Sequence, residues 1–146
     1  MLSRAYREAA SMIASIWIGL ILGVSFFAAP IKFTAAGVSL EQLLAVGKVT
    51  FQAFSWIELS TFVLLVAASL RKLTRGVVIG LFFLCLLLLI QKFGILPGLD
   101  TELNLTVAGE TVEETSLHFI YVAIDCVKVA VLLFLSLTLC NERVVV

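Results

Sequence analysis

The sequence predicts an all-α fold, an integral membrane four-helix bundle formed as one domain by residues 1–146. The first observation is composition. Of the residues, 62% are hydrophobic and only 14% are charged, whereas soluble domains have about 45–50% apolar and about 25% charged residues. The second is arrangement, because the apolar residues gather into four long stretches. One globular core of this size could not bury so much apolar surface, but a lipid bilayer can cover it.

The four stretches have the length that a membrane crossing requires, which is about 20 mostly apolar residues. They occupy residues 10–29, 49–70, 76–96 and 117–140. The sequence therefore predicts four membrane-spanning helices, with the lipid bilayer as their partner.

The N-terminal stretch superficially resembles a signal peptide, because Arg4 and Arg7 precede it. Its apolar run is longer than a signal core, which has about 7–15 residues, and Pro30 directly after it would hinder cleavage. We therefore expect a retained first helix. Since the start of the chain shows no organelle presequence, we expect the bacterial inner (plasma) membrane as its location.

Lysine and arginine residues indicate the orientation, because cytoplasmic flanks carry an excess of them. One set of flanks carries Arg4, Arg7, Arg71, Lys72, Arg75 and Arg143, and the other carries only Lys32, Lys48 and Lys92. Both termini are therefore predicted to be cytoplasmic. The segment 97–116 begins with a Pro-Gly pair and would lie outside, as a short hairpin or an exposed loop.

Two local patterns predict how helices start and pack. Ser39 and Gln42 have the spacing of a capping box, which predicts a helix that begins there and runs into the second span. In the first span, small residues recur at every fourth position, at Ser11, Ser15, Gly19 and Gly23. Small side chains let membrane helices approach closely, so this face predicts a helix contact. We favour a contact within the chain, and a second copy is the alternative.

Polar residues inside the spans are informative, since a charge at the centre of a membrane helix costs about 2.5–3.5 kcal/mol on insertion scales. Glu58 lies near the middle of the second span. In the fourth span, His118, Tyr121, Asp125 and Lys128 are three or four residues apart and share an arc of about 80° on one face. This polar stripe predicts a surface that faces the bundle interior.

The second and fourth helices run in the same direction. Glu58 lies about nine residues and Asp125 about eight residues from the outer ends of their spans, so the two carboxylates lie at similar depths. We therefore expect a cluster in which Lys128 is shared by both carboxylates. Its net charge would be −1, or zero with a shared proton, and a coupled group of this kind can titrate near neutral pH. Linking helices is the plainer role, but hydrogen bonds between membrane helices average only about 0.6 kcal/mol. We therefore favour a functional role.

Other chemistries find less support. The chain has one histidine, and Cys85, Cys126 and Cys140 are too dispersed for a metal site, so we predict no metal and buried cysteines. No cofactor is expected, with haem held by His118 as the alternative. A formal net charge of zero without a basic stripe argues against nucleic acid. The two tryptophans, Trp17 and Trp56, are predicted to serve packing alone.

Some residues also carry a family resemblance. Trp17-Ile18-Gly19, the run from Phe26 to Phe33, and His118 at the start of the last span resemble a family of small four-helix membrane proteins. That family includes bacterial proteins known by a domain of unknown function and eukaryotic relatives of transmembrane protein 205. The resemblance implies four helices and a membrane location, without a defined chemistry. The chain departs from the pattern at Tyr121, where relatives are expected to have a small hydroxyl residue.

The leading functional hypothesis is transport, or a proton- or ion-linked activity, through the polar cluster of the second and fourth helices. Its partner would be a small solute or ion. A homo-oligomer is expected, because four helices leave little room for a pathway. One alternative is a redox protein that holds haem or quinone between these helices with His118. The other is a non-catalytic scaffold that docks a partner on the small-residue face of the first helix.

Overall fold

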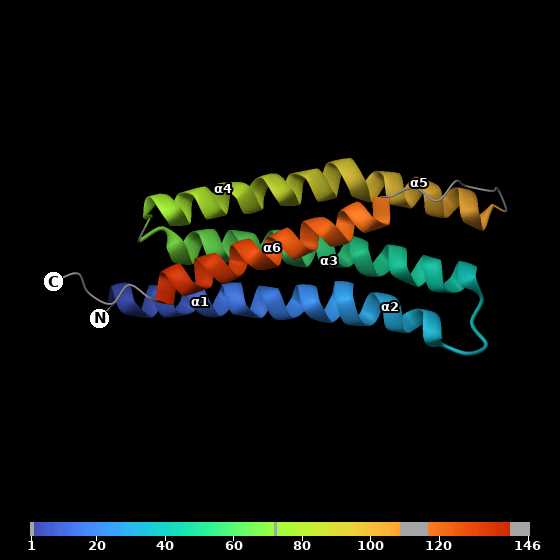
Figure 1. Cartoon of the computed structure of the whole chain (residues 1–146), viewed down its shortest axis with the longest axis horizontal. Helices are drawn as coiled ribbons and strands as arrows, with labels where there is room; N and C mark the ends of the chain where they lie inside the picture. Colours follow the sequence, from blue (N-terminus) through green and yellow to red (C-terminus); the bar gives the residue numbers. More distant parts are fainter. Residues whose placement is uncertain (1, 72, 109–116, 141–146) are drawn as a thin grey trace.

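The computed structural model describes residues 2–71, 73–108 and 117–140, and all regular structure in these ranges is helical. Four long helical segments each run antiparallel to the one before, with the start of the first and the end of the last at the same end of the bundle (Figure 1). We call the opposite end the far end.

The first segment comprises α1 (Leu2–Ile21), the π-helical turn η1 (Leu22–Ala28), α2 (Ala29–Ile31) and the 3₁₀ turn η2 (Lys32–Thr34). The second is α3 (Leu40–Ser69). The third comprises α4 (Arg75–Leu89), the π-helical turn η3 (Ile90–Ile95) and α5 (Leu96–Val107), and the fourth is α6 (Leu117–Cys140). Each segment contains one predicted span, apart from Leu70, which caps α3, and α6 has the predicted bounds.

All four segments are long and apolar enough to cross a membrane, which confirms the predicted number of such helices. The first three contain 30, 30 and 32 residues in their apolar stretches and α6 contains 24. The longer segments therefore extend past the start of α6 at the far end, as Figure 1 shows for α2, α3 and α5. The outer surface carries large apolar side chains, and Phe93 and Phe119 are 70% and 77% exposed.

The start of α3 confirms the predicted capping box. Ser39 Oγ accepts from the backbone N–H of Gln42 at 3.3 Å, and Gln42 Oε1 accepts from the backbone N–H of Ser39 at 3.1 Å. The helix then continues without a break for 30 residues, as the sequence predicts. The turn before it needs Gly37, whose φ of +79° lies in the left-handed region that favours glycine.

The segment after Pro97 corrects a prediction, because α5 is a helix where a hairpin or an exposed loop was expected. Pro97 lies in the first turn of α5, where a missing N–H is tolerated. Two hydrogen bonds then fasten α5 to α3. The Gln52 amide donates to Asp100 at 2.8 Å, and Lys48 Nζ donates to Asn104 at 3.2 Å. The end of the predicted loop, residues 109–116, lies outside the described residues.

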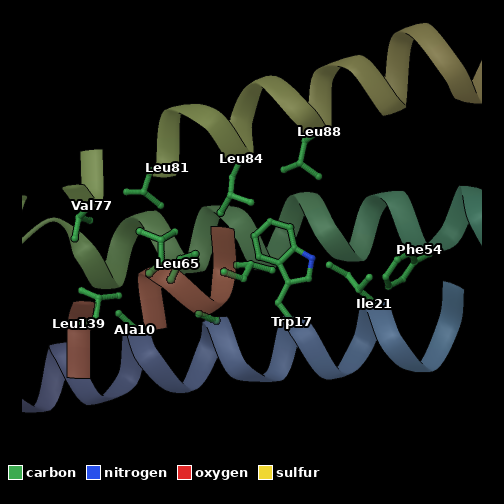
Figure 2. Packing of buried hydrophobic residues seen from close by; sticks show 13 residues of the cluster. Ala10, Trp17, Ile21, Phe54, Leu65, Val77, Leu81, Leu84, Leu88 and Leu139 are labelled. Carbon is green, nitrogen blue, oxygen red and sulfur yellow. The ribbon is translucent and has the colours of Figure 1, made fainter. Parts of the chain in front are cut away.

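The apolar core lies along the half of the bundle where α1 begins. There α1 packs against α6 and α3, and α4 packs against the same two helices. Figure 2 shows Leu81, Leu84 and Leu88 entering this core from α4 and Trp17 entering it from α1. Gly80 permits the close approach of α4 to α6, because a Cβ there would lie 2.7 Å from Leu135 Cδ2.

The predicted small-residue face of α1 divides into two parts. Ser11 and Ser15 meet α6, with their hydroxyls 2.9 and 3.2 Å from that of Ser136. Gly19 and Gly23 are exposed, and a Cβ at either position would have no neighbour within 4 Å. Packing within the chain therefore uses only the two serines.

The cysteines correct another prediction. Cys85 is half-buried, and Cys126 and Cys140 are exposed, whereas burial was expected for all three. The prediction was wrong because the outer faces of these helices are themselves apolar, so an apolar run does not identify the inward face.

Candidate functional site

Three charged side chains that the sequence analysis expected to meet do meet, about halfway along the bundle. Lys128 Nζ forms an ion pair with Glu58 Oε1 and lies 2.8 Å from Asp125 Oδ1. Glu58 comes from α3, and Asp125 and Lys128 lie one turn apart on α6. Glu58 is 2% exposed and the other two are 0% exposed. We call these three residues the charged cluster.

Two further side chains complete the network. Trp17 Nε1 of α1 donates to Glu58 Oε1 at 3.1 Å. Gln91 Nε2 of η3 donates to Asp125 Oδ1 at 2.9 Å and to the backbone oxygen of Tyr121 at 3.1 Å. Each of the four helical segments thus contributes a polar side chain to one buried network.

Sequence reasoning missed both of these residues. Trp17 was predicted to serve packing alone, which was wrong, because an indole N–H is an obligate donor and finds a partner when buried. Trp56 is 62% exposed, and the Lys92 ammonium lies 3.3 Å from its ring centre, so it does not pack in the interior either. Gln91 lies within the third predicted span, and no role was predicted for it from the sequence. The available signal was the same for both, a hydrogen-bonding group within a predicted span.

The local backbone helps to place Gln91. It is the second residue of η3, where the α-helical ladder widens into a π-helical turn. Such turns occur often at functional sites, because they alter which side chains face a neighbour. Gln91 is buried, and the next residue, Lys92, reaches sideways to Ser55 Oγ at 3.4 Å.

The network leaves charge and hydrogen-bonding capacity unmatched. Two carboxylates face one ammonium, so the charged cluster carries a net charge of −1 when all three groups are ionised. Asp125 Oδ2 and Gln91 Oε1 are buried and accept no hydrogen bond from any described residue. One proton or one small cation would neutralise the charged cluster and supply a partner to an unmatched acceptor.

A crevice reaches this network between α3 and η3. It has a volume of about 300 Å³ and is lined by residues that include Ser55, Trp56, Glu58, Gln91, Lys92 and Tyr121. Lys92 is half-buried and Glu58 is buried, so the lining of the crevice includes one residue of the charged cluster. We call this space the side crevice.

The last two predicted site residues differ in position. Tyr121 is buried beside the network, and its ring meets that of Phe51 edge-on with centroids 5.1 Å apart. His118 is exposed at the far end of α6. It lines a second space of about 640 Å³, the end cavity, whose other walls include Phe26, Lys32, Phe51, Leu99 and Glu102. The structure therefore brings together four of the five predicted residues and leaves His118 apart.

The placement of His118 bears on the redox alternative, which put a haem or quinone between the second and fourth helices. The charged cluster joins α3 to α6 through the ion pair of Glu58 with Lys128, and His118 lies apart from it and lines the end cavity. Within the part of the chain that the structure describes, no three His, Cys, Asp or Glu side chains form a metal-binding group.

Comparison with models of known protein families, with curated proteins and with solved structures finds no match. The resemblance to the transmembrane protein 205 family therefore stays a prediction.

Proposed function

We propose that this chain is a multi-pass protein of the bacterial inner membrane, with both termini cytoplasmic. We further propose that its charged cluster binds and releases a proton, and that this step is linked to the movement of an ion or small solute. The observation that carries the proposal is the buried pairing of two carboxylates with one ammonium.

The distribution of side chains supports the membrane location. Phenylalanines are exposed on the outside, and the charges of Glu58, Asp125 and Lys128 are buried inside. This is the reverse of a soluble domain, where charged residues are rarely fully buried. It suits a protein whose surroundings are hydrocarbon, in which polar side chains face the bundle interior.

The energetics support a role beyond linking helices. Carrying three ionised groups into an apolar bundle costs several kcal/mol per ion before pairing compensates. An apolar set of similar volume would hold the helices together at least as well. Retaining the charges is easier to understand when one of them changes its protonation state during the protein's activity.

The proposed route to the charged cluster runs through the two cavities. Phe51 lines the end cavity and Tyr121 lines the side crevice, so their edge-on contact separates the two spaces. Leu96 lines both. The contact of these two rings is the proposed barrier between the far end of the bundle and the charged cluster.

The experiment is infrared difference spectroscopy of the purified protein in liposomes, recorded across a pH step. The charged cluster should give the carbonyl band of a buried protonated carboxyl group that appears on acidification. Asp125→Asn or Glu58→Gln should remove it, and Glu41→Gln, which changes an exposed carboxylate of α3, should leave it. Proton flux measured with a dye inside the same liposomes should follow the band. A band that is unaffected in both cluster variants would overturn the proposal.

Assembly with a second copy is the second candidate, because Gly19 and Gly23 leave part of α1 uncovered. Close approach of two such faces is the usual way for small residues to join membrane helices. Gly19→Leu should leave the stability of the single chain unchanged and abolish a dimer seen by native mass spectrometry. Glu58→Gln should leave that dimer intact. A dimer that survives Gly19→Leu and Gly23→Leu would exclude this face.

A further inference from the structure

The end cavity has the size and composition of a ligand site, and no residue of the charged cluster lines it. Its volume of about 640 Å³ lies within the range of about 300–1,000 Å³ for small-molecule pockets. The far ends of the first three helical segments line it together with the start of α6, which contributes His118 and Val122. Its walls are largely aromatic and aliphatic, with Phe26, Phe33, Leu44, Phe51, Leu99 and Leu103 among them. Such walls suit an apolar chain.

One cation in this cavity, the Lys32 ammonium, has no carboxylate partner among the described residues. The ammonium of the half-buried Lys32 lies against the backbone of Gly47, where an added Cβ would collide with it. It lies 5.0 Å from the ring centre of Phe33 and 5.8 Å from that of Phe51. No described carboxylate pairs with it. Lys48, in the same cavity, already donates to Asn104 at 3.2 Å.

A second polar group in the cavity also lacks a partner. Ser25, in η1, is only 6% exposed, and its Oγ has no hydrogen bond among the described residues. A buried hydroxyl without a partner costs about 1–3 kcal/mol. Ser25 lines the cavity together with Lys32, so a ligand head group could satisfy both.

The acidic residues of the cavity limit the charge of such a ligand. Asp100 already accepts from the Gln52 amide at 2.8 Å. Glu102 has one buried oxygen without a hydrogen-bond partner in the described part of the chain, and its charge would repel a dianion about twice as strongly as a monoanion. A head group with a single negative charge therefore suits this cavity better than one with two.

We infer that the end cavity binds a single-chain amphiphile with a monoanionic head group. The apolar chain lies along the aromatic walls, the head group receives hydrogen bonds from the Lys32 ammonium, and Ser25 Oγ supplies a further one. A carboxylate of a fatty acid and a phosphodiester of a lipid share this chemistry. The inference is independent of the proton-linked proposal, because Lys32 and Glu58 line different cavities.

The test measures binding of radiolabelled laurate to the protein in phosphatidylcholine nanodiscs. Lys32→Gln should weaken binding by about tenfold or more, since a hydrogen bond to a charged group contributes a decade or more of affinity. The matched control is Lys48→Gln, which removes the other lysine of the cavity and should change binding little. Lys32→Arg should retain binding.

Competition identifies the head group and its source. Displacement of laurate by lauroyl-lysophosphatidylglycerol would indicate a membrane lipid, and its failure would indicate a free fatty acid. Dodecanol or dodecylamine competing as well as unlabelled laurate would overturn the inference, because recognition would not involve a negative charge. Equal weakening by Lys32→Gln and Lys48→Gln would also overturn it.

A variant with the lysine retained guards against misfolding. Ser25→Ala removes a buried hydroxyl that has no hydrogen-bond partner among the described residues, so this variant should fold. It should still weaken laurate binding, because the hydrogen bond from Ser25 Oγ to the head group is lost. If Lys32→Gln does not fold and Ser25→Ala binds laurate as the original chain does, the inference fails.

Discussion

The charged cluster and the end cavity use the same kinds of side chain in opposite ways. In the charged cluster, Lys128 contacts both carboxylates and all three groups are buried. In the end cavity, the Lys32 ammonium lies near two aromatic rings and the backbone of Gly47. In the described ranges it has no carboxylate partner, and one oxygen of Glu102 has no hydrogen-bond partner. The first set of charges is matched within the chain, except for one negative charge. In the end cavity, the Lys32 ammonium and the Glu102 oxygen remain available to a ligand.

This difference separates two roles of buried polarity. A buried charge with partners inside the chain contributes to the fold. Removing one partner lowers stability strongly, because the other charge is then buried without compensation. A charge without partners contributes little to the fold and can be altered with a small effect on stability. Substitutions in the two regions should therefore differ in which property they change.

The largest effect is expected at Lys128. Lys128→Met keeps much of the side-chain length and leaves two buried carboxylates without their ammonium. It should lower the free energy of unfolding by about 3–5 kcal/mol. The measurement is unfolding by sodium dodecyl sulfate in mixed micelles. Lys48→Met is the control and should have little effect. Similar losses for the two variants would contradict the difference drawn between the regions.

An intermediate effect is expected at Trp17. Trp17→Phe keeps an aromatic ring in the core and removes the N–H that donates to Glu58. The loss in free energy of unfolding should be about 1–3 kcal/mol, the penalty for a buried polar group that loses a partner. Trp56→Phe is a matched control, because a ring remains beneath the Lys92 ammonium. Its effect should stay within about 0.5 kcal/mol. Equal losses would mean that the indole N–H has no special role.

The smallest effect on stability is expected at Lys32. Lys32→Gln removes a charge that has no ion-pair partner in the described chain, so the free energy of unfolding should change by less than about 0.5 kcal/mol. The same unfolding assay, without added amphiphile, measures it. Added laurate should stabilise the original chain and not this variant, because a ligand that binds the folded state raises its stability. A large loss of stability in the absence of ligand would mean that Lys32 contributes to the fold as Lys128 does, which would contradict the difference between the two regions.

The sequence predicted the fold correctly where the length of an apolar stretch determines the helix. The bounds of α6 and the capped start of α3 follow from local patterns, and the ion pairs of Lys128 follow from the spacing of residues on one face of α6. What it could not predict depends on contacts between segments. The helix after Pro97 is fastened by Gln52 and Lys48 of α3, and the partner of Trp17 lies on another helix. The exposed cysteines show that an apolar run alone does not distinguish inside from outside.

The two π-helical turns have a consequence for the evolution of this chain. Ser25 lies in η1 and Gln91 lies in η3, so each cavity receives one buried polar residue from such a turn. A turn closed by i→i+5 bonds holds one residue more than the α-helical ladder, which rotates everything after it by about 100°. Deleting one residue from 90–95 would therefore turn Asp100 of α5 away from Gln52. Homologues aligned with this chain should show single-residue gaps within 22–28 and 90–95, and those with a gap should lack the corresponding polar residue.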